Sequence, residues 1–196
     1  MKVLTSCLML CVTAATVHAQ PPGEPRRIAF VDVGYARTWD DEGFLGSGAG
    51  LTGGVGVRLT GRTTVQALVS RIPYHRDIEY LTFDGRVLFA GAEASFRARR
   101  RTVRPFFTIG AGVFNDSGVW VQKTTIDPTQ PRVHTTIDRD YTLGAFTSSG
   151  GIDFAVSERA SVRAGVRLYG LLQTGDGRDL APHTIIQPAI GVAYRW

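Results

Sequence analysis

The closing segment of the chain, TIIQPAIGVAYRW over residues 184–196, alternates between two kinds of side chain. Successive side chains of a β-strand point to opposite faces, so this segment presents one apolar face and one small or polar face. The apolar face carries Ile186, Ile190, Val192, Tyr194 and Trp196, and the other carries Gln187, Ala189, Gly191, Ala193 and Arg195. An apolar face outside and a polar face inside are typical of the last strand of a membrane β-barrel.

Seven other segments repeat this period-two pattern. With the last one, the segments lie near residues 28–38, 48–60, 63–73, 86–97, 105–115, 141–157, 161–172 and 184–196. Their apolar faces carry no charge in the middle, and the chain has no run of about 18 apolar residues that would predict a transmembrane helix. The pattern predicts an all-β fold, an eight-stranded antiparallel up-and-down transmembrane β-barrel. The sixth segment is irregular, because Leu143 lies at a position that belongs to the polar face.

The links between these segments alternate in length. Short links are expected at 60–62, 98–104 and 157–160, and longer ones at 39–47, 74–85, 116–140 and 173–183. Outer-membrane barrels show this asymmetry, with short periplasmic turns and longer external loops. The pattern therefore places both ends of the barrel on the periplasmic side and the longer loops outside.

The inward faces carry charges of both signs. Acids, arginines and one tyrosine make up the predicted interior polar network: Asp32, Arg58, Glu93, Asp153, Arg163, Arg167 and Tyr169. Paired charges are tolerated in an interior where isolated charges are not, and eight strands leave only enough room for side chains. We therefore expect a polar interior that is plugged, and not a large pore.

The amino terminus has the features of an export signal. Lys2 precedes an apolar run over 3–12 that is too short to span a bilayer, and the small residues Val17 and Ala19 follow it. We expect a signal peptide over 1–19, a short segment over 20–27 and the barrel domain over 28–196. The alternative is a lipoprotein signal acylated at Cys11, although Leu10 is bulky where such signals need a small residue.

From residue 28 to its end, the chain resembles the small outer-membrane β-barrel proteins of the OmpA/OmpX type. The resemblance implies a location in the outer membrane of a Gram-negative bacterium, surrounded by membrane lipid and lipopolysaccharide. It also implies that the barrel-assembly machinery recognises the closing residues Ile190, Val192, Tyr194 and Trp196. That family usually ends in Phe, so the terminal Trp196 is a departure that weakens the expected recognition.

Arginine supplies nearly all of the positive charge, since the only lysines are Lys2 and Lys123. Several arginines fall at or near the expected external rim: Arg37, Arg71, Arg76, Arg86, Arg132, Arg139 and Arg178. Arginine binds phosphate through two hydrogen bonds, so we expect these residues to contact lipopolysaccharide head groups. The alternative is that they fill solvated positions in an arginine-rich protein. A further basic cluster at 97–104 is interpreted as a solvated turn and not as a nucleic-acid site.

The expected role is structural or interactive: membrane integrity, adhesion, or binding by the external loops, of which 116–140 is the longest. We expect no cofactor, no metal and no nucleic-acid partner, and the sequence does not identify an extracellular partner. The acidic pairs Asp138/Asp140 and Asp176/Asp179 have too few ligands for a calcium site.

Two other functions remain open. A lipid A-modifying enzyme would need a serine, a histidine and a carboxylate that converge toward the acyl region of the membrane. The candidate histidines His75, His134 and His183 fall in expected external loops, and none stands in the His-x-Ser arrangement of lipid A deacylases. Ser70 and Ser148 are conceivable nucleophiles, but we expect no enzymatic activity. A soluble lipocalin-like carrier of an apolar ligand would need an apolar interior, which the charged inward faces argue against.

Overall fold

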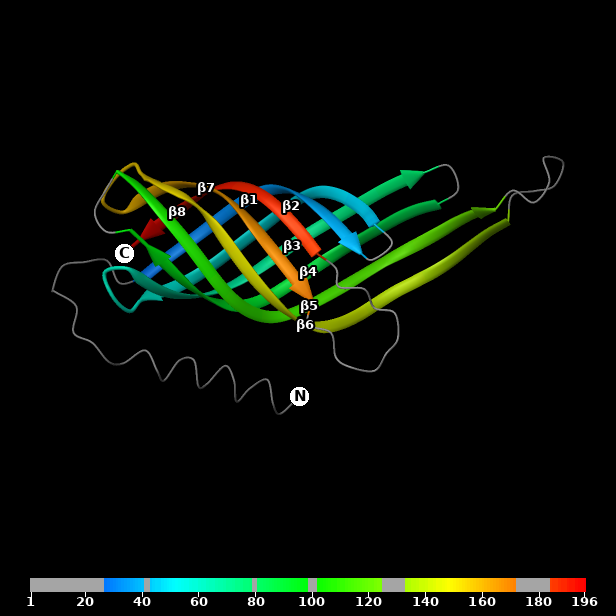
Figure 1. Ribbon diagram of the computed structural model, residues 1–196, viewed down its shortest axis with the longest axis horizontal. Coiled ribbons are helices and arrows are strands. Elements are labelled where there is room, and N and C mark those ends of the chain that lie inside the picture. The colour runs from blue at the N-terminus through cyan, green and yellow to red at the C-terminus, as the bar shows by residue number, and fades with distance from the viewer. Residues whose placement is uncertain (1–26, 41–42, 79–80, 99–101, 125–132, 172–183) are drawn as a thin grey trace.

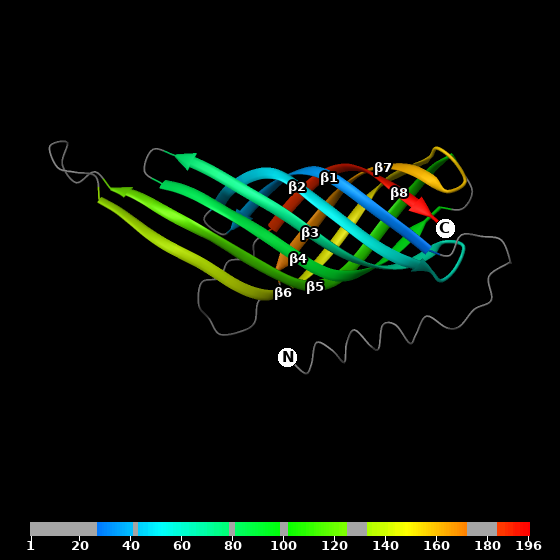
Figure 2. The ribbon, with the colours of Figure 1, turned by 180° about the vertical axis from the view of Figure 1, so that it is seen from behind.

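The computed structural model describes residues 27–40, 43–78, 81–98, 102–124, 133–171 and 184–196. Within these ranges, eight strands form a closed antiparallel barrel in which chain neighbours pair and β1 pairs with β8 (Figures 1 and 2). The strands are β1 (Arg27–Asp40), β2 (Gly43–Arg58), β3 (Thr63–Ile78), β4 (Leu81–Arg97), β5 (Val103–Thr124), β6 (Val133–Ala155), β7 (Ala160–Leu171) and β8 (Thr184–Arg195). The predicted eight-stranded fold is confirmed, whereas the predicted signal peptide lies outside the described residues. No helix in the described ranges is long and apolar enough to cross a membrane.

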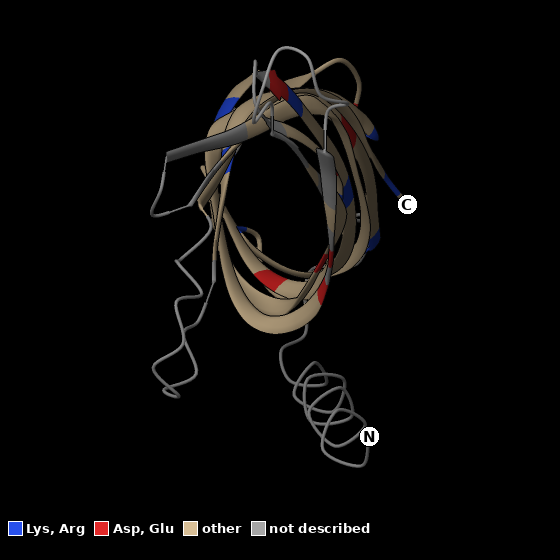
Figure 3. Cartoon of the chain, turned by 90° about the vertical axis from the view of Figure 1, so that its right-hand side faces the viewer, with Lys and Arg blue, Asp and Glu red and all other residues tan. Residues whose placement is uncertain are grey.

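The two faces of the barrel wall differ as the period-two pattern predicts. Large apolar side chains cover the outside, where Val55, Val69 and Ile190 are 59%, 60% and 61% exposed. Charged side chains are buried inside the barrel, where Glu93 and Asp153 are 2% and 0% exposed. Figure 3 shows the ring of strands seen along the barrel. A soluble carrier barrel has the reverse arrangement, with apolar side chains inside and polar ones outside. The outer face is therefore suited to lipid.

One end of the barrel, here called the turn end, holds the short connections. The Thr60 hydroxyl in the β2–β3 turn accepts hydrogen bonds from two backbone N–H groups at 3.2 and 3.0 Å. Ser157 in the β6–β7 turn does the same at 3.3 and 3.0 Å. Such hydroxyl groups fix tight turns. The barrel also closes here, because the backbones of Arg27 and Trp196 exchange two hydrogen bonds of 3.0 and 3.1 Å.

The opposite end, here called the projecting end, differs from the prediction. β5 and β6 are 22 and 23 residues long, whereas β7 and β8 have 12 residues each. The β5–β6 hairpin, with β3 and β4 beside it, therefore extends beyond the other strands (Figures 1 and 2).

The prediction of long loops at 39–47, 74–85 and 116–140 is wrong, because most of these residues belong to strands. Beyond the apolar band, hydrophobic alternation ends while backbone pairing continues, so a prediction from hydrophobicity stops too early. The fourth expected loop, 173–183, lies outside the described residues.

Candidate functional site

An ion-pair cluster lies inside the barrel near the turn end. The Asp153 carboxylate on β6 accepts a 2.7 Å hydrogen bond from Arg195 on β8 and lies 3.3 Å from the Arg97 guanidinium on β4. Arg195 also donates to the Ser161 hydroxyl on β7 at 3.1 Å. The three charged side chains are at most 8% exposed. The cluster therefore joins four strands across the interior.

The sequence analysis placed Asp153 and Arg195 on inward faces, but it left Arg195 out of the interior polar network and missed Arg97. Arg97 is the last residue of β4 and points inward, so the interpretation of 97–104 as a solvated turn is wrong at its first residue. Alternation would have identified Arg97, because it lies on the same face of β4 as Glu93. Arg58, predicted for the same interior, is half-buried at the end of β2.

Glu93 is the centre of a second polar group, in the middle of the barrel. Its carboxylate accepts hydrogen bonds from Gln66 at 2.9 Å and from Thr147 at 3.1 Å. The same carboxylate lies 3.5 Å from the Arg167 guanidinium. Glu93 and Arg167 therefore lie together inside the barrel, and neutral donors complete the hydrogen bonds of the carboxylate.

Arg163 is held chiefly by aromatic rings. Its guanidinium carbon lies 4.8 Å from the centre of the Phe30 ring and 4.6 Å from the centre of the Phe106 ring. Its nearest carboxylate, Asp32, is 4.0 Å away. Desolvated cation–π contacts contribute about 2 kcal/mol each. A buried guanidinium without a close ion pair is therefore stabilised by the two rings.

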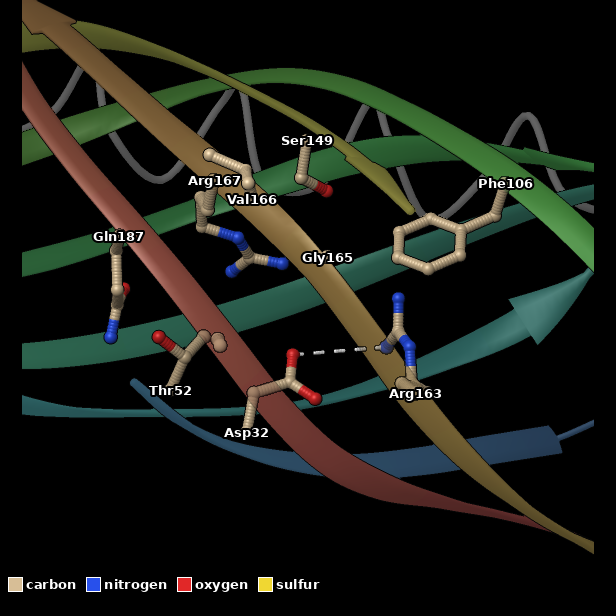
Figure 4. Close-up of a pocket in the computed structure, with 10 residues that line it drawn as sticks. Asp32, Thr52, Phe106, Ser149, Arg163, Gly165, Val166, Arg167 and Gln187 are labelled. Atoms are coloured by element: carbon tan, nitrogen blue, oxygen red, sulfur yellow. Dashed lines mark ion pairs between the residues drawn. The ribbon is translucent and has the colours of Figure 1, made fainter. Parts of the chain in front are cut away.

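A small cavity separates the Asp32–Arg163 pair from Arg167 and Gln187 (Figure 4). Its volume is about 20 Å³, and Phe106 closes one side. A cavity of this size holds about one water molecule and no organic ligand. Side chains therefore fill this part of the interior, and this cavity has no room for the apolar ligand of a lipocalin-like carrier.

Tyr169, on β7, lies between the charged interior and the projecting end and is the centre of a group of hydrogen bonds. Its hydroxyl shares a 2.7 Å hydrogen bond with Ser70, lies 3.4 Å from the Thr52 hydroxyl and donates to Gln187 at 3.3 Å. All four side chains are buried. Ser70, considered from the sequence as a nucleophile, is therefore enclosed inside the barrel with no access to lipid.

Beyond Tyr169 the interior becomes apolar, which the sequence analysis did not predict. The side chains of this apolar layer are at most 1% exposed: Ile72, Val87, Phe89, Phe114 and Ile185. Phe89 packs edge-on against Tyr169, with 5.3 Å between ring centres. Leu143 packs against the same cluster. Its position on the polar face of the sixth segment is therefore explained by an inward apolar side chain. The layer separates the charged interior from the projecting end.

On the outside, Arg37, Arg71 and Arg86 are exposed on β1, β3 and β4. On the outward faces of β1 and β3, Arg37 and Arg71 directly follow Tyr35 and Val69, and Arg86 precedes Leu88 on β4. Arg86 donates to the Ser117 hydroxyl at 3.1 Å. These arginines therefore form a rim at the edge of the apolar band. The remaining predicted rim residues are less informative: Arg76 is half-buried, the side chain of Arg139 is not described, and Arg132 and Arg178 lie outside the described residues.

The predicted assembly signal lies on the outer face of β8. Ile190, Val192, Tyr194 and Trp196 are all exposed, and the rings of the last two stack with 6.2 Å between centres. Their outward position agrees with the parity on which the prediction rests.

Comparison with known proteins gives a match in structure but none in sequence. No protein-family model matches the chain, and no curated protein sequence matches it significantly. The crystal structure of Neisserial surface protein A superposes with a TM-score of 0.65 and 14% identity, covering 87% of this chain and 97% of that one. The chain has the fold of a small outer-membrane β-barrel.

Two further structures support this fold. The outer membrane protein OprG from Pseudomonas aeruginosa gives a TM-score of 0.52 at 9% identity, over 90% of this chain and 99% of that chain. Ail of Yersinia pestis, solved with the heparin analogue sucrose octasulfate, gives 0.51 at 14% identity, over 87% and 99%.

Proposed function

We propose that this chain is an integral outer-membrane protein of a Gram-negative bacterium and that its projecting end is an external interaction surface. The observation that carries the membrane assignment is the band of exposed apolar side chains around a closed barrel. On β1 this band runs from Ala29 to Tyr35 and is bounded by Arg27 and Arg37. The 9 residues between these two arginines, 28–36, match the ~9–11 residues that a tilted transmembrane strand needs. A closed barrel also pairs its backbone groups internally, as lipid requires.

The projecting sheet supports the interaction role. β6 pairs with β5 along its whole length but with β7 only from Ala145 onward. Among the described residues, the other edge of 133–144 therefore has no pairing partner. An open edge can accept an extended polypeptide as an additional strand. Because the proposed interaction uses the backbone edge of β6, the partner that it favours is an extended peptide segment.

Cysteine labelling in intact cells tests the membrane assignment and its orientation. The native cysteines, Cys7 and Cys11, fall in the expected signal peptide, so the mature chain would carry no thiol. We expect a membrane-impermeant maleimide to label Thr136→Cys, on the projecting hairpin, and to leave Thr60→Cys, in a turn, unlabelled until the cells are lysed. Equal labelling of both variants in intact cells would contradict the proposed orientation. Recovery of the protein in the soluble fraction would contradict the membrane assignment.

The rim arginines support contact with lipopolysaccharide phosphates. Guanidinium groups at the edge of the apolar band lie at the depth expected for head groups, and they form paired hydrogen bonds with phosphate. We expect replacement of Arg37, Arg71 and Arg86 by Gln to reduce lipopolysaccharide co-purification. The matched control replaces exposed arginines of the turn end by Gln: Arg27, Arg62 and Arg159. An equal loss in both sets would attribute the effect to total charge and not to the rim.

Export and assembly complete the proposal. A signal peptide over 1–19 would direct the chain to the periplasm, and the barrel-assembly machinery would recognise the outward residues of β8. The exposed row that ends in Tyr194 and Trp196 supports this recognition, because the row is available before the barrel closes.

A further inference from the structure

Three chemically complementary side chains form a row across the outer face of β2, β3 and β4. Ser47 pairs with His75 across β2 and β3, and His75 pairs with Asp84 across β3 and β4. The parity of each strand directs all three side chains outward. His75 Nδ1 and Asp84 Oδ1 share a hydrogen bond of 2.6 Å, and the two side chains are 58% and 67% exposed. The row therefore faces the surroundings of the barrel.

We propose that Ser47, His75 and Asp84 form a hydrolytic triad that cleaves acyl esters of outer-leaflet lipids. In such a triad a carboxylate holds one ring nitrogen of histidine, and the other nitrogen takes the proton of the nucleophile. Asp84 occupies His75 Nδ1, which leaves Nε2 as the base. This inference departs from the expectation that the barrel has no enzymatic activity. The sequence did not indicate the triad, because its three residues come from three different strands and form no sequence motif.

Ser47 is within reach of His75. Directly paired residues of antiparallel strands have Cβ atoms about 4.5–5.5 Å apart. In the structure the Ser47 hydroxyl shares a 2.6 Å hydrogen bond with the Tyr35 hydroxyl on β1. In the proposed reaction, rotation about χ1 of Ser47 would release this hydroxyl from Tyr35 for His75, and side chains outside the core change rotamer within picoseconds to nanoseconds. Catalytic hydrogen bonds commonly tighten only when substrate is bound.

The position of the row selects the substrate class. Tyr35 and Leu51 are outward residues at the edge of the apolar band, and Ser47 lies beyond them on β2. Acyl ester groups of lipids lie at this boundary between hydrocarbon and head groups. Arg37 pairs with Ser47 from the β1 side and is exposed. Its guanidinium is placed to stabilise the negative charge that develops on an ester oxygen.

The reaction is a hydrolysis with water as co-reactant. Ser47 Oγ attacks the ester carbonyl carbon while its proton passes to His75 Nε2, which gives a tetrahedral oxyanion near Arg37. The bond to the alcohol oxygen breaks, the alcohol leaves with the proton from His75, and an acyl-serine remains. Water then attacks this acyl group while His75 takes its proton. Release of the carboxylic acid restores the Ser47 hydroxyl.

An alkyl fluorophosphonate that labels activated serines tests the triad on the full-length protein in outer-membrane vesicles. We expect labelling at Ser47, located by mass spectrometry, and none in Ser47→Ala. His75→Asn removes the base and should slow labelling by about 10²–10⁴-fold. Asp84→Asn should also slow it. Ser117→Ala is the matched control, since Ser117 lies on the outside of β5 and belongs to no such row.

A second assay measures fatty-acid release from vesicles of phosphatidylcholine alone and from vesicles with added lipopolysaccharide. Release from the first identifies phospholipid esters as substrate, and release only from the second identifies lipopolysaccharide esters. Each variant is first checked for its folded, heat-modifiable band, so that loss of activity is not loss of fold. Absence of Ser47 labelling in the unmodified protein would overturn the proposal. Labelling that is unchanged in His75→Asn would overturn it as well.

Discussion

Removal of the Asp153 carboxylate tests the account of the interior most directly. This carboxylate is 0% exposed and serves two arginines, Arg195 at 2.7 Å and Arg97 at 3.3 Å. Removing one partner of a buried ion pair costs about 3–5 kcal/mol, because a charge stays buried without compensation. Asp153→Leu leaves two such cations at once, so we expect a loss near the upper end, about 5 kcal/mol.

The cluster offers its own controls. Arg195→Met leaves the Arg97–Asp153 pair in place, so it should cost less than Asp153→Leu. The triple variant Asp153→Leu, Arg97→Met, Arg195→Met removes all three charges, and well-packed apolar replacements of ion pairs are often neutral or stabilising. We therefore expect the triple variant to recover most of the stability that Asp153→Leu loses.

Urea unfolding in lipid vesicles measures these differences. The chain has 3 Trp residues as fluorescence probes, and the gel shift on heating confirms the folded state. The reasoning would be refuted by a cost below about 1 kcal/mol for Asp153→Leu, since the pair would then behave like an exposed one. A triple variant less stable than Asp153→Leu would refute it too.

Three further predictions follow from the fold. Phe89→Ala opens the apolar layer, so we expect current steps in planar bilayers that contain this variant. The outward control Phe146→Ala and the unmodified protein should give no current steps. Absence of current steps from both variants would show that other side chains seal the barrel. Gly110→Ala would place a Cβ against the backbone oxygen of Ala92 on β4 and should cost about 1–3 kcal/mol in urea unfolding. Gly53→Ala has its nearest contact at 3.7 Å, so its midpoint should barely move, and equal shifts would contradict the packing argument. Trp196→Ala should lower the amount of heat-modifiable protein in the outer membrane, and Trp196→Phe should preserve it.

Much of the membrane-spanning part of the fold follows from sequence, because one physical rule governs it. Lipid outside and a packed interior force strict alternation, and the buried side chains of Glu93, Arg163 and Arg167 follow it. The same rule applied to the last residue of β4 would have added Arg97, whereas Arg195 was already assigned to the polar face of the last strand.

The rest depends on information that alternation does not carry. Beyond the apolar band the outward side chains meet water, so outward apolar residues no longer mark the strand and the projecting hairpin is missed. The apolar layer is missed for the opposite reason, since Phe89 and Phe114 occupy inward positions where polar residues were expected. The Ser47–His75–Asp84 row depends on strand register, which is set by pairing across the whole barrel and not by spacing along the chain.

The apolar layer also means that two groups of apolar residues contribute to the stability of this barrel, one in contact with lipid and one in contact with protein. Outward residues such as Val55 exchange one apolar environment for another when the bilayer changes, so their contribution varies with lipid type and thickness. Ile72 and Phe89 contact only protein, and their burial is driven by release of water from apolar surface. Part of the folding free energy is therefore independent of the membrane, and it should persist in bilayers that suit the outer face poorly.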